Sequence, residues 1–330
     1  MKLNINTLYN FTSFKNAQTA LETNFKDNEA GTILARNLEV VDPTIFKQEY
    51  SGLTFLQSGI QINNIGGWSE FVTKIKRKIV GDFTDGDDTT NGTGKISVAA
   101  EKDTIPVFPK EAFSAWADDE VKQAQLENRN LVSELIEGHN EVYNRNIDEI
   151  GYVGQFFRDG TSKTEGLLNF SGFTSTAAAS NVEALTAEAA YNAIKDLIVR
   201  RRTAAKGNAV LMPTNVVFPT RVWEYINGTI INTAGTSLSI LETLESKYPN
   251  ITFGATDKAE STGNGGQFLA NSATVCYSNN NRALVMRIPM TLEIGEIIKP
   301  SSFKFRVDTR YRIAGLDVIE NDAGEILTGL

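Results

Sequence analysis

One strand near the end of the chain constrains the fold more than any other feature. From Phe303 to Ile313, side chains suited to a core alternate with charged ones. Successive side chains of a strand point to opposite faces of a sheet, so this pattern predicts one core face and one charged face. The predicted inward residues are Phe303, Phe305, Val307, Thr309, Tyr311 and Ile313, and the predicted outward ones are Lys304, Arg306, Asp308, Arg310 and Arg312.

A second alternating stretch, residues 71–80, carries charge along most of one side. A segment rich in Gly and Asp follows (81–94), and then a second β-like stretch (95–108). The three together predict a long hairpin with a solvated tip. A two-stranded hairpin is unstable alone, so we expect it to lie on this protein's own body or on a neighbouring subunit. The candidate contact residues on it are Lys74, Lys76, Arg77, Lys78, Asp82 and Asp85.

Residues 117–150 give the strongest helix signal. Apolar residues recur there at spacings near three and four, and Asp118 and Asp119 would suit the positive end of the helix dipole. One continuous helix of this length would span roughly 50 Å, which suits a strut. Gly138 is the position at which we expect it to bend.

The stretch 185–292 interleaves helical and strand patterns. Thr186 can cap one helix, and Ser237 or Ser239 can open another. A strand pattern over 209–218 lies between them. This region is therefore predicted to form an α/β domain of its own. The whole chain is predicted to belong to the α+β class.

A turn is predicted before this region. The residues that indicate this turn are Gly160, Gly166 and Asn169, and Leu167 and Leu168 are expected to be buried beside it. Glycine at such a point indicates a positive φ or a close approach of two backbones.

Composition excludes several functions. The 330-residue chain has a net charge of −8, whereas proteins that clamp nucleic acid usually carry excess Lys and Arg. Its one Cys excludes an intrachain disulfide and Cys-rich zinc sites. No apolar run reaches the roughly 20 residues that span a bilayer, and we expect no secretory signal in this form of the chain.

Four groups of residues are candidates for chemical or binding roles. His139 has no companion nucleophile or ligand in the sequence, so we expect a histidine on a helix surface. Cys276 lies in an apolar strand and is expected to be an inert core residue. The Asp-rich hairpin tip lacks the spacing of a calcium loop, and Arg200–Arg202 suits a solvated helix end, with a subunit or DNA contact as the alternative. We therefore predict no catalytic residue, no metal and no cofactor.

The order of these elements resembles one family. The residues that carry the resemblance are Trp116–Glu120 after the hairpin, Gly160–Asn169, and the closing strands Arg282–Met286 and Arg310–Leu316. They are similar to the major capsid proteins of tailed bacteriophages with the Hong Kong 97-type fold, in a branch that is also encapsulin-like. The resemblance covers most of residues 45–325.

The resemblance implies a four-part subunit and a structural function. The parts would be an N-terminal arm (1–48), an extended hairpin loop (49–115), a peripheral domain with a spine helix (116–184 and 293–330) and an axial domain (185–292). Such subunits form hexamers and pentamers of an icosahedral shell around double-stranded DNA, which they enclose by weak, non-specific proximity. The implied location is the virion capsid, assembled in the host cytoplasm without a membrane. Scaffolding, portal and decoration proteins are further candidate partners, and Arg306, Arg310 and Arg312 are candidate subunit contacts.

Three alternatives stay open at this point. An encapsulin-type compartment would use the same fold and would need a cargo-docking pocket. A hydrolase that depends on carboxylates would need two acidic residues facing each other across a cleft. A tail or adhesin protein would bind host glycans.

Overall fold

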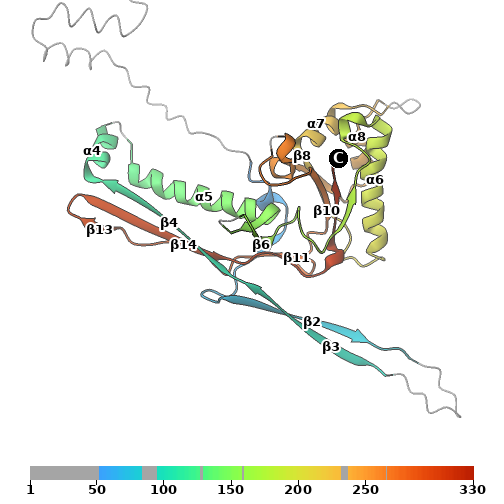
Figure 1. Ribbon diagram of the computed structural model, residues 1–330, viewed down its shortest axis with the longest axis horizontal. Coiled ribbons are helices and arrows are strands. Elements are labelled where there is room, and N and C mark those ends of the chain that lie inside the picture. The colour runs from blue at the N-terminus through green and yellow to red at the C-terminus, as the bar shows by residue number, and fades with distance from the viewer. Residues whose placement is uncertain (1–51, 84–94, 127–128, 158–159, 232–236, 265) are drawn as a thin grey trace, which may run out of the picture. The chain divides into compact units, whose positions relative to one another are not determined.

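The computed structural model describes residues 52–83, 95–126, 129–157, 160–231, 237–264 and 266–330. The arm predicted for residues 1–48 lies outside these ranges, and so does Asp85 of the hairpin tip. Helices and strands are mixed along the chain, which confirms the predicted α+β class (Figure 1). Within the described residues, no helix combines the length and apolarity needed to cross a membrane.

The alternating C-terminal strand is β14 (Lys304–Ile313), and it forms the centre of a four-stranded sheet. Along its whole length it pairs antiparallel with β4 (Phe108–Ala117). Its other edge pairs with β12 (Met290–Ile294) and with β13 (Ile298–Ser301). The predicted inward face is confirmed over most of the strand, but Phe303 precedes β14 and is largely exposed. The prediction for Phe303 was wrong because the pairing starts one residue later.

The spine is two helices and not the single helix that we predicted. They are α4 (Asp118–Leu126) and α5 (Leu131–Val153). Asn130 caps α5, because its side-chain oxygen accepts a hydrogen bond from the Ser133 N–H at 3.2 Å. That cap starts a new helix where the apolar spacing runs on unchanged. Gly138 lies inside α5 and interrupts nothing.

The predicted hairpin is present as β2 (Phe71–Val80) and β3 (Ser97–Pro106). The two strands pair antiparallel in one unbroken register, from Phe71 opposite Pro106 to Val80 opposite Ser97. They form a sheet of two strands, which we call the ribbon (Figure 1). The second predicted strand was too long, since residues from Phe108 onward belong to β4.

A five-stranded sheet carries the α/β region. Its strands, in spatial order, are β7 (Thr174–Ala177), β16 (Gly324–Thr328), β10 (Ala273–Tyr277), β8 (Asn215–Pro219) and β9 (Thr252–Thr256). Side chains on one face share a core with three helices, and side chains on the other face join the core beneath α5. The helices are α6 (Ala187–Ala204), α7 (Thr220–Gly228) and α8 (Ile240–Lys247).

The helix caps in this region were predicted correctly. Thr186 accepts from the Ala189 N–H, and Ser239 forms a capping box with Glu242. The strand predicted over 209–218 was placed too early. Asn208 forms a turn with Val210 and Leu211, which delays β8 until Asn215.

Two small sheets and several short turns complete the described chain. One is a three-stranded sheet and the other is a pair of strands. The three strands, in spatial order, are β1 (Gln61–Asn63), β11 (Leu284–Arg287) and β15 (Gly315–Val318), and the pair is β5 (Gly154–Phe156) with β6 (Ser162–Glu165). The 3₁₀ turns are η1 (Phe55–Gln57), η2 (Val182–Ala184), η3 (Asp257–Ala259), η4 (Thr262–Asn264) and η5 (Asn321–Ala323).

Candidate assembly surfaces

The ribbon has two chemically different faces. One face carries Lys74, Lys76 and Lys78, with Asp103 and Glu101 opposite the first two on β3. The other carries the apolar side chains Phe71, Ile75, Ile79 and Val98, which are 58, 64, 74 and 64% exposed. We call these four the apolar stripe. Such a row of exposed large side chains along a paired strand is unusual on a free protein and marks a contact surface.

The remaining predicted contact residues of the ribbon lie as follows. Arg77 stands on the same face as the apolar stripe, opposite Ala100. Lys78 is exposed, and Lys76 is half-buried in the middle of β2. Asp82 is exposed beyond the end of β2, where its carboxylate accepts from the Phe83 N–H at 2.8 Å. Among the described residues, no group of three or more acidic, His or Cys side chains could hold a metal ion.

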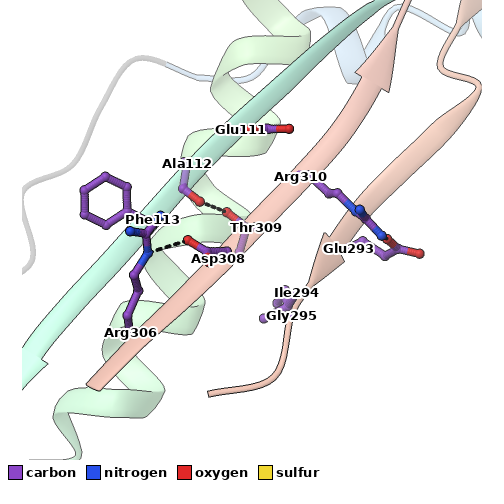
Figure 2. Close-up of a pocket in the computed structure, with 10 residues that line it drawn as sticks. All are labelled: Glu111, Ala112, Phe113, Glu293, Ile294, Gly295, Arg306, Asp308, Thr309 and Arg310. Carbon is purple, nitrogen blue, oxygen red and sulfur yellow. Dashed lines mark hydrogen bonds and ion pairs between the residues drawn. The ribbon is translucent and has the colours of Figure 1, made fainter. Parts of the chain in front are cut away.

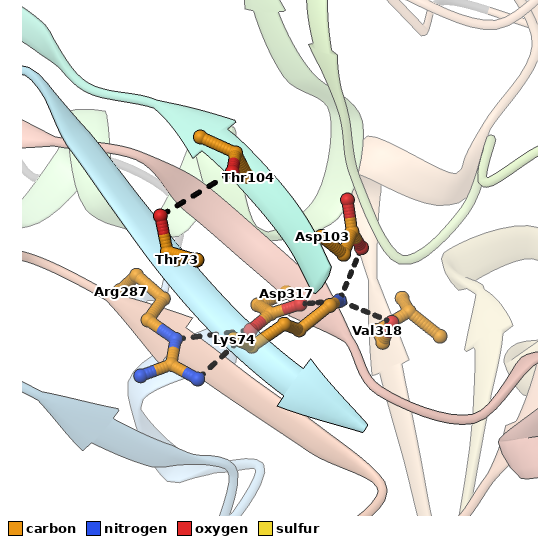
Figure 3. A network of polar contacts seen from close by, with 7 residues as sticks. All are labelled: Thr73, Lys74, Asp103, Thr104, Arg287, Asp317 and Val318. Atoms are coloured by element: carbon orange, nitrogen blue, oxygen red, sulfur yellow. Dashed lines mark hydrogen bonds and ion pairs between the residues drawn. The ribbon is translucent and has the colours of Figure 1, made fainter. Parts of the chain in front are cut away.

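Lys74 is the point at which the ribbon meets the body of the protein (Figure 3). Its ammonium donates to a carboxylate oxygen of Asp317 and to the Val318 carbonyl, the latter at 3.1 Å. It also pairs with Asp103 across the ribbon at 3.0 Å. The hydrogen bond from Lys74 lowers the pKa of the Asp103 carboxyl. Arg287 binds the second oxygen of Asp317 through Nε and Nη2, at 3.0 and 2.9 Å.

The outer face of the β14 sheet carries the three arginines predicted as contacts. Arg306 lies over the Phe113 ring at 4.3 Å and pairs with Asp308 at 2.7 Å. Arg310 pairs with Glu293 at 2.8 Å. With Ile294 and other neighbours these residues line a groove of about 720 Å³, which we call the sheet groove (Figure 2).

Trp68 closes one end of this arginine row. Its ring lies 4.3 Å from the Arg310 guanidinium and 5.0 Å from that of Arg312. Arg312 also donates to the Trp68 carbonyl at 2.8 Å. Arginine and aromatic side chains are enriched at protein interfaces, so this face has the composition of a contact surface. The sequence prediction named the arginines but missed Trp68 and Phe113, whose single positions showed no pattern.

The inner face of the same sheet is fixed to α5. His139 Nε2 lies 2.9 Å from Ser114 Oγ, and its Nδ1 lies 3.1 Å from Thr309 Oγ1. Because the Thr309 hydroxyl donates to the Ala112 carbonyl, it accepts from Nδ1–H of the histidine. His139 therefore joins a helix to two strands, and the expected surface position was wrong.

The predicted turn is a close approach of two backbones. The Gly166 N–H donates to Asn169 Oδ1 at 2.7 Å, and the Asn169 amide donates to the Val153 carbonyl at 2.8 Å. Leu167 and Leu168 are buried, as predicted. Gly160 takes a positive φ of 85° in the preceding turn.

The two remaining groups of candidate residues belong to the α/β region, where Cys276 and Arg201 are buried and Arg200 is exposed. Cys276 is fully buried, and burial raises the pKa of its thiol to about 12. Arg200 pairs with the buried Glu325 at 2.7 Å, and Arg202 lies 4.7 Å from the Tyr248 ring. Arg201 is buried at the end of α6, which corrects the prediction of a solvated run of three arginines. The helix turns that arginine toward the sheet.

Comparison with known proteins decides the family. The family model described as "Major capsid protein" matches residues 87–329. The chain belongs to the major capsid protein family. Its closing strands and spine helices, on which the sequence resemblance was based, lie inside the matched residues. No curated protein matches this capsid protein in sequence.

Solved capsids support the same assignment. The capsid of Myoviridae phage XM1 is 44% identical, with a TM-score of 0.80 over 90% of this chain and 98% of that one. The capsid of a native GTA particle is 13% identical with a TM-score of 0.63, over 90% and 98% of the two chains. A structure from Microbacterium phage Oxtober96 is 9% identical with a TM-score of 0.60, over 91% and 98%. The latter two show a shared fold alone.

The capsid protein therefore has the Hong Kong 97-type fold and a structural function in a phage capsid shell. It is not an enzyme, and the hydrolase, encapsulin and adhesin alternatives are not favoured.

Proposed function

We propose that this capsid protein assembles into hexamers and pentamers that close an icosahedral shell around double-stranded DNA. The observation that carries the proposal is the apolar stripe of the ribbon. Its four large side chains are exposed on the single chain, and the edges of a two-stranded ribbon also leave backbone groups unpaired. Covering this stripe with a neighbouring subunit would remove apolar surface from water, which favours association.

The four-part division of the subunit is part of this proposal. The arm is assigned to 1–48, the extended hairpin to 49–115, the peripheral domain to 116–184 with 293–330, and the axial domain to 185–292. Two pairings run across these boundaries. β4 belongs to the β14 sheet, and β7 and β16 complete the sheet of the α/β region. They would join the hairpin, peripheral and axial parts to one another.

The enclosed DNA and the accessory proteins of the shell are also part of the proposal. With a net charge of −8, the subunit would enclose DNA without a tight phosphate grip. Assembly would take place in the host cytoplasm, and scaffolding, portal and decoration proteins would join the shell.

Electron microscopy and light scattering of the purified protein test the proposal. We expect rings or closed shells. The double variant Ile75→Ser/Ile79→Ser should keep its melting temperature, because exposed substitutions change stability by about 0.5 kcal/mol or less. It should lose shell formation. The matched control is Val199→Ser/Ile230→Ser, which removes two exposed apolar side chains outside the ribbon. A protein that stays monomeric across salt concentrations and with crowding agents would contradict the proposal.

A further inference from the structure

Few polar contacts join the ribbon to the rest of the described protein. At its root, the Val107 N–H donates to the Glu70 carbonyl at 2.8 Å. Beyond that point, and within the described ranges, Lys74 is the one ribbon side chain with polar contacts to the rest of the protein. A cavity of about 280 Å³ lies beside this contact, lined by Lys74 and Lys76 of the ribbon and by Lys163 and Asp317 of the body, among others. Lys74 therefore makes the polar contacts that join the ribbon to the body beyond this first hydrogen bond.

Asp317, which accepts the hydrogen bond from Lys74, has a second cationic partner on the body. Asp317 is 1% exposed, and Arg287 holds one of its oxygens with a hydrogen bond from Nε and an ion pair from Nη2. Removing one partner of a buried ion pair is usually costly because it leaves a buried charge alone. Here the departure of Lys74 leaves Asp317 paired with Arg287, so the usual penalty does not apply.

Lys74 also has a second ion-pair partner, which lies on the ribbon. Asp103 lies opposite it on the ribbon, 3.0 Å from its ammonium, and moves with it. Figure 3 shows Lys74 in contact with Asp103 and Asp317 at the same time, with Arg287 on the other oxygen of Asp317. An opening of the contact between Lys74 and Asp317 would leave Lys74 with Asp103 on the ribbon and Asp317 with Arg287 on the body. Both the closed and the open arrangement therefore have partnered charges, as a two-state element requires.

We propose that Lys74 and Asp317 form a releasable latch, which holds the ribbon in one direction on the free subunit and opens when neighbours take up the apolar stripe. The proposal rests on the assembly function above. The latch would select one direction of the ribbon, and thereby one curvature of the shell, before subunits meet.

The latch can be observed on single subunits with a pair of spin labels. The native Cys276 is buried and its thiol pKa is raised, so it should not react with the label. Exposed alanines provide the two labelling sites, through Ala100→Cys on the ribbon and Ala204→Cys at the end of α6. Below the concentration at which shells form, the otherwise unsubstituted protein should give one narrow distance distribution.

Three further substitutions in that labelled protein test the latch. Lys74→Met should broaden the distribution while the melting temperature of the body stays in place. Lys74→Arg should restore the narrow peak, because it keeps the charge. Lys78→Met removes the same charge from the same face without touching Asp317 and should change nothing. In unlabelled protein, Lys74→Met should give open or irregular assemblies in the electron microscope.

The outcomes separate the latch from the assembly function. A narrow, unshifted distribution in Lys74→Met overturns the latch, whatever the shells look like. A broad distribution with normal shells overturns its role in curvature. If Lys74→Met broadens the distribution but unsubstituted protein builds no shells, the hold of Lys74 on the ribbon stands, whereas its release by neighbours and the proposed assembly function both fail.

Discussion

A Cβ atom on Gly166 would stand 2.4 Å from the carbonyl carbon of Tyr152, closer than folded proteins allow. The residues that follow Gly166 bind the same segment, since Leu167 and Leu168 donate to the carbonyls of Gly151 and Tyr152 at 2.9 and 2.8 Å. The end of α5 and the turn after β6 are thus pressed together through their main chains. Only glycine leaves room for this contact.

Gly166→Val should therefore destabilise the subunit strongly. The added side chain would push the two backbones apart and break the hydrogen bonds between them. Overpacking and lost hydrogen bonds together predict a loss of about 3 kcal/mol or more in the free energy of unfolding. Thermal melting followed by circular dichroism measures it.

Gly138→Ala is the control for this glycine. Nothing lies within 4 Å of a Cβ at Gly138, which sits inside α5. Alanine there should stabilise the helix by about 0.5–1 kcal/mol. If Gly166→Val melts like the unsubstituted protein, the turn is an ordinary loop and the close approach has no energetic role.

Glu149 should make stability depend on pH. Burial raises the pKa of its carboxyl, ahead of the opposing effects of Lys258 and Lys110. The folded state then binds this proton more readily than the unfolded state, so the stabilising effect of the proton is present at low pH. It is lost as pH rises through the interval between the ordinary and the raised pKa.

Glu149→Gln imitates the protonated form at every pH. It should raise the melting temperature near pH 7 and change it little at a pH below the ordinary carboxyl range. Glu224→Gln, at an exposed position of α7, serves as the control and should leave both values unchanged. A lower melting temperature for Glu149→Gln near pH 7 would mean that the nearby cations outweigh burial.

The sequence predicted the features of this fold that depend on local chemistry. The alternation of β14, the caps at Thr186 and Ser239 and the buried leucines beside Gly166 all follow from neighbouring side chains. β4 was missed because it is defined by pairing with β14, nearly 200 residues away in the chain, as in the contact of Thr309 with Ala112. The break before α5 was missed because the helical spacing of apolar residues continues through Asn130.

The orientation of the ribbon shows a further limit of sequence patterns. Alternation places Phe71, Ile75 and Ile79 on one face, and such a face is normally expected in a core. Here these side chains are exposed, while Lys74 on the opposite face contacts buried Asp317. A period of two identifies the faces of a strand but does not say which of them faces the body.

The arginines of the sheet groove should matter more for assembly than for folding. Arg306 and Arg310 form exposed pairs with Asp308 and Glu293, and such pairs contribute about 1 kcal/mol or less. Arg306→Glu/Arg310→Glu should therefore melt within a few degrees of the unsubstituted protein. Shell formation should decline if acidic side chains of a neighbour face this groove, because like charges across an interface are costly.

The control for the groove is Arg306→Lys/Arg310→Lys, which keeps both charges. Assembly yield is measured by sedimentation and electron microscopy across a range of salt. Normal shells from the Glu variant would refute an interface at this groove.

Removing the ribbon should separate the folding of the subunit from its assembly. Replacing residues 72–105 by a short Gly/Ser linker deletes most of β2 and β3 but leaves β4 paired with β14. Asp317 keeps Arg287 as its partner in this variant. The body should therefore remain soluble and melt cooperatively, although it loses the apolar stripe and with it the capacity to build shells.

The deletion gives three distinguishable results, and only one agrees with the proposed assembly. A folded body without shells, as judged by circular dichroism melting and electron microscopy, agrees with it. An unfolded protein would mean that the ribbon contributes to the core, against the exposure of Ile75 and Ile79. Normal shells would mean that the ribbon is peripheral to assembly. Ribbon contacts that include exposed charges are screened within about 10 Å at 0.1 M salt, so shells of the complete protein should also weaken as salt rises.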